Sequence, residues 1–469
     1  MLPSIPTNDI AYNLLHEGSL ALERAEHVGM VIDVDYCQKQ EKALERKIDY
    51  YKTKLRSTKV GHLWETIYTG KLNFNSDTQL KTILFDKLKL EPHKLTEKGN
   101  PSLDDESIEA LSSQAEGVHY ISKIRKYQKT KNTYIKGMLR EQVGGILRPF
   151  FNFIPSTYRS SSSNINFQNI PKRDVEMMNM VRQAIYAHWG YRIFAIDFSG
   201  IEVRASEFYH KDPVMMEYIL KPDANMHRDL AMQLFKLESL DKEHDEEKHL
   251  YNGGKNGFVF PQFYGDYYGN NAKSLWKWAK MHGHRVKNDD GIVLKDGTPL
   301  GTHLRNQGIK SYQKFEDHVK DVEDDFWNRR FRVYQKWKED LTDFYNEKGY
   351  VETLTGFRTS GVLTRNQIIN FPIQGTAFHL LLKTFIEMDK QLLKQGFKSR
   401  LMGQIHDEFL IALHPSELQG VVRMALRIIE KKLPKIWPWI NTPMEVEAEI
   451  CPVNRPWNEK KSFNLKQAV

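Results

Sequence analysis

The segment QIHDEFLIAL, residues 404–413, places His406, Asp407 and Glu408 side by side in an otherwise apolar run. A buried unpaired charge is costly, so a strand that enters a core should not carry three titratable groups without a function. Strand-length apolar runs flank them on both sides, which predicts an antiparallel hairpin with the acidic pair at its tip. A second apolar strand, YRIFAID, ends at Asp197. We expect Asp197 to occupy the adjacent strand end.

Two carboxylates held a few ångströms apart repel each other unless a cation lies between them. Hard oxygen ligands suit Mg²⁺, which keeps several waters and also binds substrate phosphates. Two such ions roughly 3.5–4 Å apart can activate an attacking hydroxyl and stabilise the leaving oxygen of an in-line displacement. The alternative is that Asp197 is a helix N-cap and HDE an ordinary exposed turn. Taken singly, each segment favours that alternative.

The composition sets broad limits on the protein class. The chain has 469 residues and 40% hydrophobic content, enough for a substantial core and more than one domain. Its net charge of +8 weakly favours a polyanionic partner such as nucleic acid. The two cysteines, Cys37 and Cys451, form no disulfide framework or zinc-finger spacing. Without a secretory signal or an apolar stretch of about 20 residues, we expect a cytoplasmic protein (host cytoplasm if viral) and no membrane partner.

Periodicity indicates a mixture of helices and strands, an α+β class. A helix with a regular apolar stripe is expected from Gln374 to Gly396, and the alternation in MEVEAEI predicts a half-buried strand. A basic helix covers residues 120–140, and its ordinary interpretation is a solvated face. A polar, glycine-containing segment at 281–303 interrupts a mainly helical region and is expected to be an insertion loop.

Several segments together resemble the family A DNA polymerases, the bacterial polymerase I class. AIDFSGIEVRASEF is similar to the first palm motif, QIHDEFLIAL to the third, and KNGFVFPQFYG to the fingers-helix motif between them. Further similar segments occur in the family's order along nearly the whole chain: NSDTQLKTILFDKL, KTKNTY, FQNIPKR, VRQAI, GYVETLTGFR and FPIQGTA. The resemblance implies a right-hand fold whose palm has an antiparallel sheet plus helices, with helical fingers and a helical thumb.

The resemblance also implies a domain order. Residues 1–155 would hold an N-terminal segment and the thumb, and 156–228 the first part of the palm with the first catalytic aspartate. The fingers would span 229–345, with the insertion near 281–303, and the second part of the palm 346–469 with the HDE hairpin. No segment before the thumb is long enough for a 3′–5′ proofreading exonuclease, so we expect that activity to be absent from this chain.

The resemblance assigns catalytic roles to the acidic motifs. Asp197 and Asp407 would bind two Mg²⁺ ions, with Mn²⁺ as a substitute, that activate the primer 3′-hydroxyl and neutralise the triphosphate. Glu408 would tune the site without being an obligatory ligand. His406 would contact the primer end, with a structural role as the alternative. Lys255 would hold the incoming triphosphate against its developing charge.

A nucleotide pocket is implied by five further positions. Glu202 would block the sugar 2′ position and so favour deoxynucleotides; the alternative is an ion pair with nearby Arg204. Arg182 and His227 match positions that line the same pocket.

Two aromatic residues of the fingers motif complete this pocket. Phe260 would pack on the incoming nucleotide, and Tyr264, one helical turn on, would lie near the templating base. Without the neighbouring motifs, the ordinary explanation of Phe258, Phe260, Phe263 and Tyr264 is core packing.

Three polar residues resemble minor-groove readers: Arg159, Asn370 and Gln374. Groove acceptors are present in every base-pair orientation, so hydrogen bonds there can test pairing without reading sequence. A structural role is the alternative for Asn370.

The sequence departs from the family pattern at two places. Gly200 stands where the family usually has glutamine. Lys255 and Tyr264 are nine positions apart, where the family has eight, and Tyr251 replaces an arginine one turn before Lys255. We expect a π-bulge near Gly257 to absorb the extra residue.

We expect a monomeric enzyme that extends a primer on a DNA template with dNTPs in replication or repair, similar by analogy to phage or viral replication proteins. A separate exonuclease, helicase or primase is a further expected partner. One alternative is a metal-dependent nuclease, which would not need the nucleotide-pocket residues. The other is a degenerate polymerase fold that only binds DNA; detectable dNTP incorporation would exclude it.

Overall fold

A five-stranded antiparallel sheet forms the centre of the molecule, with the strand order β10-β11-β7-β12-β13. Its strands are β7 Arg192–Phe198, β10 Arg400–Ile405, β11 Glu408–Leu413, β12 Val446–Ile450 and β13 Lys461–Phe463. The predicted hairpin is therefore confirmed as β10 and β11, joined by a two-residue turn. The half-buried strand predicted from MEVEAEI is β12.

The computed structural model describes residues 5–92, 94–96, 99–112, 114–152, 159–170, 174–221 and 224–468. The last three residues of the FQNIPKR segment lie outside these ranges, as does the expected domain boundary at 155. No helix within these ranges is both long enough and apolar enough to cross a membrane.

The two faces of the central sheet belong to different hydrophobic cores. Along β7, Phe194 and Ile196 enter one core, whereas Ile193 and Ala195 enter another. Because side chains alternate along a strand, Asp197 falls on the same face as Ile193 and Ala195.

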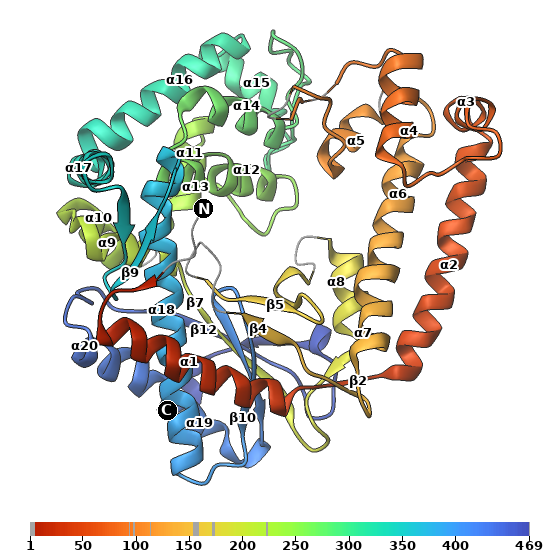
Figure 1. Ribbon diagram of the computed structural model, residues 1–469. Helices are drawn as coiled ribbons and strands as arrows, with labels where there is room; N and C mark the ends of the chain where they lie inside the picture. The colour runs from red at the N-terminus through yellow and green to blue at the C-terminus, as the bar shows by residue number, and fades with distance from the viewer. Residues whose placement is uncertain are drawn as a thin grey trace.

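Long helices cover the face that holds Phe194 and Ile196 (Figure 1). A small antiparallel sheet with the order β1-β9-β8 adjoins them. The elements of this layer are α1 Asp9–Val28, α9 Ile201–His210, α18 Arg365–Lys394, α19 Leu418–Arg427, η7 Ile428–Lys432, α20 Leu433–Ile436, β1 Ile5–Pro6, β8 Tyr350–Glu352 and β9 Phe357–Ser360.

Helix α18 begins at Arg365, earlier than the expected start at Gln374. Thr364 and Gln367 form a reciprocal capping box that fixes this start. Pro372 lies inside the helix. The start of α18 is therefore set by its capping residues, and Pro372 does not end the helix. The buried apolar face extends through these first turns, and its packing stabilises them.

The opposite face of the sheet packs against a mainly N-terminal group of elements that includes the small sheet β3-β2-β6. The two-stranded sheet β4-β5 follows in the chain, and Phe151 of β4 is buried in the first core, against α1. In Figure 1, α2 and α6 stand side by side at the edge of the molecule. The elements are α2 Val34–Arg56, α3 Lys59–Ile67, α4 Asp77–Lys81, η1 Thr82–Lys87, α5 Asp105–Leu111, α6 Val118–Lys129, η2 Thr130–Ile135, α7 Lys136–Glu141, α8 Val175–Arg182, β2 Met30–Ile32, β3 Ile146–Leu147, β4 Phe150–Asn152, β5 Ser161–Ser163 and β6 Ile185–Tyr186.

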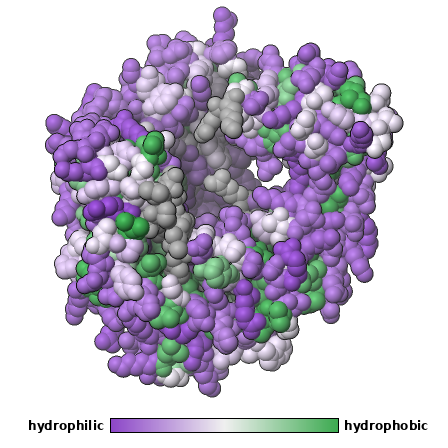
Figure 2. All heavy atoms as spheres, viewed as in Figure 1, coloured by the Kyte–Doolittle hydropathy of each residue, from purple (hydrophilic) through white to green (hydrophobic). Residues whose placement is uncertain are grey.

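A third group of helices has its own core, rich in aromatic residues. Figure 1 shows it across an opening from α2 and α6, and Figure 2 shows this predominantly hydrophilic face hollowed between the two groups. Its elements are α10 Pro213–Leu220, α11 Met226–Phe235, α12 Glu247–Gly253, η4 Gly254–Val259, α13 Phe260–Phe263, α14 Tyr268–Trp278, α15 Leu300–Asn306, α16 Tyr312–Asp324, η5 Asp325–Arg330 and α17 Arg332–Lys348.

The segment at 281–303 is mostly irregular and ends in the start of α15. It is fastened to the start of α12, because the Glu247 carboxylate accepts a hydrogen bond of 2.8 Å from the backbone N–H of Lys295. The Lys295 ammonium also pairs with Asp241 at 2.7 Å. The expected insertion loop is thus an ordered part of the third helical group.

Candidate active site

The register of the central strands brings the two acidic motifs together. Asp197 on β7 is the direct cross-strand partner of Glu408 on β11 and of Glu447 on β12. The backbone N–H of Phe198 donates a hydrogen bond of 3.1 Å to the carbonyl of Asp407 in the turn. The predicted adjacency of the two strand ends is confirmed. The helix N-cap alternative for Asp197 is wrong, because Gly200 caps α9.

Gly200 also explains one departure from the family pattern. It has φ +59° and lies at the turn between β7 and α9. This left-handed conformation is accessible to glycine at little cost and strained for a larger side chain. The residue therefore serves the turn that follows Asp197.

A hydrogen-bond network of Gln404, Ser160 and Gln168 supports the HDE turn. The side chain of Gln404 is buried, and its Nε2 donates to the carbonyl of His406. Its Oε1 accepts hydrogen bonds from Ser160 Oγ at 2.6 Å and Gln168 Nε2 at 3.0 Å. His406 itself is exposed, with φ +53°. Sequence reasoning missed this network, although a glutamine inside an apolar strand was a visible signal.

Glu408 is only 3% exposed, and a lysine from the C-terminal segment compensates its charge. Lys460 Nζ lies 3.3 Å from Glu408 Oε1 and also pairs with Glu449. Neither partner was identified from the sequence, because the contacts are made only in the folded chain.

Arg182 lies beside these carboxylates. Its guanidinium is 4.2 Å from the ring centroid of Trp457, and burial lowers its pKa, whereas Glu408 raises it. A cavity of about 360 Å³ is lined by Met178, Arg182, Asp197, Glu408, Glu449, Trp457, Asn458 and Lys460. The lining of this cavity includes none of the other residues predicted for the nucleotide pocket.

Glu202 joins two other predicted site residues. Its carboxylate pairs with Arg159 and accepts a hydrogen bond from the Tyr264 hydroxyl. Burial raises the pKa of the Glu202 carboxyl above its ordinary value. The charge of Arg159 and the hydrogen bond from Tyr264 act to lower this pKa, whereas the nearby charge of Asp407 acts to raise it. The alternative pair with Arg204 does not form, since Arg204 pairs with Glu445 at 2.7 Å.

Lys255, His227 and Phe260 form a second cluster. Lys255 Nζ lies 5.6 Å from the Phe260 ring centroid, and the His227 ring lies 5.4 Å from the same ring. Phe260 in turn stacks on Tyr264, with centroids 6.3 Å apart and an interplanar angle of 8°. Burial, and next the Lys255 charge, lower the pKa of His227 to about 4, so the imidazole is neutral at pH 7. The stack joins this cluster to Glu202.

The helix that carries Lys255 contains the predicted π-bulge. Residues Gly254–Val259 form the π-helix η4, which absorbs the extra residue between Lys255 and Tyr264. A Cβ on Gly254 would fall 2.6 Å from the carbonyl oxygen of His227. Glycine is therefore required for the close approach of η4 to α11.

The four aromatic residues of this motif divide into two pairs. Phe258 and Phe263 are buried in the core of the third helical group, so core packing explains them. Phe260 and Tyr264 are half-buried and face Lys255 and Glu202. Only the second pair takes part in the candidate site.

Asn370 and Gln374 lie one turn apart on α18, and both are half-buried. Gln374 hydrogen-bonds the side chain of Tyr264. The Oδ1 atom of Asn370 is buried and has no hydrogen-bond partner within the residues placed by the structure. A buried amide oxygen without a partner is rare in a structural role, which favours a ligand-facing one.

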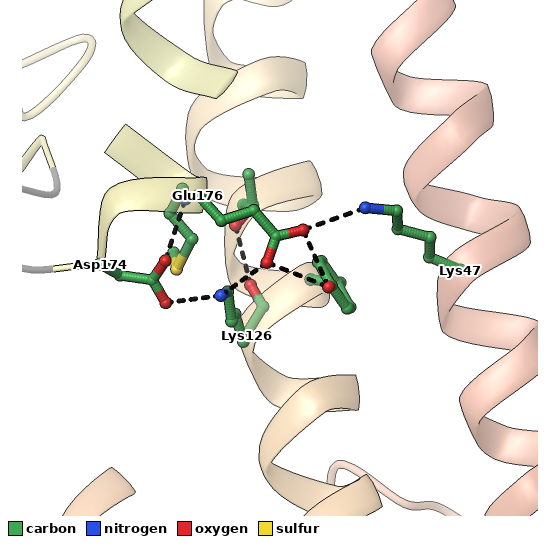
Figure 3. A network of polar contacts seen from close by, with 7 residues as sticks. Lys47, Lys126, Asp174 and Glu176 are labelled. Carbon is green, nitrogen blue, oxygen red and sulfur yellow. Dashed lines mark hydrogen bonds and ion pairs between the residues drawn. The ribbon is translucent and has the colours of Figure 1, made fainter. Parts of the chain in front are cut away.

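The basic helix predicted at 120–140 is partly neutralised within the protein. Figure 3 shows Lys126 between Asp174 and Glu176, at 2.7 Å and 2.8 Å, with Lys47 of α2 at 3.0 Å from Glu176. Burial acts against ionisation of Glu176, but Lys126 and Lys47 lower its pKa to about 2. The network links α2, α6 and α8.

A larger cavity of about 1060 Å³ connects this helix with the HDE turn. Its lining includes Arg125, Lys126 and Lys129 from α6, Gln168 and Asn169 near the sheet, and His406. Four carboxylates line it as well: Asp77, Asp105, Glu109 and Asp174. Arg125 pairs with Asp77 and Lys126 with Asp174, so the lining of this cavity is mixed in charge.

The profile of DNA polymerase family A matches residues 34–260 and 316–458. The chain belongs to DNA polymerase family A. Among curated relatives, DNA polymerase I of Bacillus subtilis is 27% identical to this chain; the match covers 92% of this chain and 44% of the relative. DNA polymerase I of Aquifex aeolicus is 28% identical, and that match covers 92% of this chain and 64% of the relative. The chain thus spans less than two thirds of the length of these relatives.

A solved structure supports the fold. The POL domain of Pol1 from M. smegmatis, in complex with DNA primer-template and dNTP, covers 95% of this chain and 70% of that chain, with a TM-score of 0.72 at 20% identity. The chain therefore has the α+β right-hand fold of family A. The family profile leaves 261–315 unmatched, so Tyr264 and the insertion lie outside it.

Family A polymerases generally use divalent metal ions, and the carboxylates of this chain fit such a use. The part of the chain that the structure describes contains no group of three or more histidine, cysteine or acidic residues arranged to hold a metal. Asp197 and Asp407 instead lie on adjoining backbone segments, at the end of β7 and in the hairpin turn. Two carboxylates suit Mg²⁺, which takes its other ligands from water and substrate phosphates.

Proposed function

We propose that this chain is a template-directed DNA polymerase that adds dNTPs to a primer 3′-hydroxyl in replication or repair. The strongest support is the strand register that joins the Asp197 strand end to the Asp407 turn. Membership of family A supports the same reaction.

Asp197 and Asp407 would hold two Mg²⁺ ions, or Mn²⁺ in their place. When bound, the ions would supply the charge neutralisation needed for in-line phosphoryl transfer. The task of the protein itself is to keep the two carboxylates in position. Gln404 does so by holding the carbonyl of His406, and the buried Lys460–Glu408 pair anchors the first residue of β11.

The fingers residues would select and hold the nucleotide. The Lys255 ammonium would bind the triphosphate, and neutral His227 could donate or accept one hydrogen bond there. Phe260 would pack on the nucleotide. The buried Glu202 carboxylate, supported by Arg159 and Tyr264, would exclude a sugar 2′-hydroxyl.

The duplex would occupy the cavity between α6 and the HDE turn. Asn370 and Gln374 on α18 would contact the minor groove beside Tyr264, and His406 the primer end. Arg182 would act on the carboxylate side of the site, where it stacks on Trp457. The M. smegmatis relative holds DNA primer-template and dNTP, which supports the same ligands here.

For the domains we propose the order expected from the family. Residues 1–155 would hold an N-terminal segment and the thumb, 156–228 and 346–469 the palm, and 229–345 the fingers. Helix α1 of the N-terminal segment packs in the same core as the palm helix α18. Helix α17, which ends at Lys348, spans the last of these boundaries.

Primer extension with each dNTP and each rNTP, with and without Mg²⁺, tests the proposal. We expect templated, Mg²⁺-dependent incorporation of dNTPs. Magnesium-dependent digestion without incorporation would indicate the nuclease instead, and DNA binding without either reaction would indicate a degenerate fold. The cluster of Glu202, Tyr264, Lys255 and His227 favours the polymerase, because a nuclease has no need for a nucleotide pocket.

A further inference from the structure

A basic groove lies on the palm, between the end of α18 and the helical segment formed by α19, η7 and α20. Its volume is about 600 Å³. Five cationic side chains and no carboxylate line it: Arg423, Arg427, Lys431, Lys432 and Lys435. None of these residues belongs to the candidate active site.

Four of the five cations lack a partner within the protein. Lys432 pairs with Glu387, but Arg423, Arg427, Lys431 and Lys435 are exposed and form no ion pair with any residue in the described ranges. They recur every four residues along one continuous helical segment. Like charges at this spacing destabilise a helix, so an anionic ligand would relieve their repulsion.

The floor of the basic groove is apolar. Phe397, Met424 and Ile428 line it, and the Phe397 ring lies so close to α19 that a Cβ on Gly420 would fall 2.9 Å from it. A phosphate backbone gains little from an apolar floor. A protein segment that alternates acidic and apolar side chains can use both the floor and the cations.

The position of the basic groove separates it from the duplex cavity. Val421, Val422 and Ala425 of α19 pack in the core on the Phe194 side of the sheet, whereas Asp197 lies on the other side. In Figure 1, α19 lies at the lower end of α18, remote from the opening between α2 and the third helical group. Its occupant is therefore a separate partner and not the primer-template.

We propose that the basic groove docks an acidic segment of a partner protein. An aromatic or aliphatic side chain of that segment rests on Phe397 and Met424, and its carboxylates pair with Arg423, Arg427, Lys431 and Lys435. The proposal does not depend on the polymerase reaction, because the groove contains no residue of the candidate site.

Fluorescence anisotropy of the full chain tests the proposal. The probe is a short labelled peptide of aspartate and glutamate residues with one phenylalanine and one leucine at its centre. The test variant is Arg427→Glu with Lys431→Glu, and the matched control is Lys39→Glu with Lys42→Glu on exposed positions of α2. We expect saturable binding that weakens at least ~10-fold in the test variant, is unchanged in the control, and falls with added salt.

Two further probes identify the class of ligand. Replacing the phenylalanine and leucine of the peptide with alanine should weaken binding, because the apolar floor loses its contact. Labelled oligothymidylate of matched charge should not lose affinity in the test variant. The proposal is overturned if the peptide does not bind, if both variants bind it equally, or if the groove substitutions weaken the oligonucleotide and not the peptide. Circular dichroism should show both variants folded, since all four substituted side chains are exposed.

Discussion

Glu202 and Tyr264 lie 62 residues apart in the chain, and the Tyr264 hydroxyl donates a hydrogen bond to the buried Glu202 carboxylate. The same carboxylate pairs with Arg159. A residue from the start of α9 is thereby fixed against the end of the fingers helix, beside Phe260. These contacts hold the Glu202 carboxylate in the position from which it would exclude a ribose 2′-hydroxyl.

Glu202→Ala should weaken the exclusion of ribonucleotides. Removing the carboxylate opens space at the sugar and leaves Arg159 and Tyr264 without their shared partner. We expect the ratio of kcat/KM for dNTP over rNTP to fall roughly 10- to 100-fold, the scale of discrimination by small steric differences. Single-nucleotide primer extension measures the ratio. Glu217→Ala, at an exposed position of α10, is the control; an unchanged ratio in Glu202→Ala would reject the assignment.

Gln404→Leu should disturb the HDE turn. The substitution removes the donor to the His406 carbonyl and leaves the Ser160 hydroxyl without its acceptor, whereas Gln168 keeps its hydrogen bond to Ser160. Buried polar groups left unpaired cost about 1–3 kcal/mol of stability, and we expect kcat to fall ~10-fold with the KM for primer-template little changed. Ser160→Ala removes the hydrogen bonds of Ser160 to Gln404 and Gln168 but leaves the bond from Gln404 to the His406 carbonyl, so it should reduce stability but spare kcat. Equal kcat losses in the two variants would contradict a positioning role.

Lys460→Met should destabilise the protein by about 3 kcal/mol, because it removes the ammonium from a buried carboxylate, Glu408. The double variant Glu408→Gln with Lys460→Met should recover part of this loss. Urea unfolding of the variants gives the free energies. Lys461→Met changes the exposed neighbouring residue and is the matched control. If Lys460→Met and Lys461→Met have the same stability, the buried pair does not anchor the strand.

Lys255→Met should raise the pKa of His227 from its value of about 4, because a nearby positive charge disappears. The pKa should remain below the ordinary histidine value, since burial is the larger cause. Histidine NMR titration between pH 3 and 7 measures it, with Lys248→Met on the exposed part of α12 as control. An unchanged His227 pKa in Lys255→Met would place the two groups farther apart than the structure does.

Much of the site could be predicted from local patterns. Apolar runs of strand length correctly indicated the strands around Asp197 and the HDE hairpin. The nine-residue spacing of Lys255 and Tyr264 correctly indicated a π-helical turn. These features depend on residues that are close together in the sequence, so local periodicity and spacing are enough to predict them.

The contacts that hold the site could not be predicted in this way. Ser160 meets Gln404 across 244 positions and Lys460 meets Glu408 across 52. Only the folded sheet brings such residues together, and no local periodicity encodes the pairing. The placement of Arg182 beside Trp457 has the same cause. The early start of α18 depends on the capping box of Thr364 and Gln367, which the apolar stripe after Gln374 does not indicate.

Primer extension by Asp407→Ala, compared with Asp343→Ala at an exposed position of α17, tests the central claim most directly. The account predicts that incorporation by Asp407→Ala falls at least ~10²- to 10³-fold, the loss expected when a group that stabilises developing charge is removed. Primer-template affinity should be largely retained, and Asp343→Ala should extend normally. Normal extension by Asp407→Ala would contradict a shared metal site at the joined ends of β7 and the hairpin.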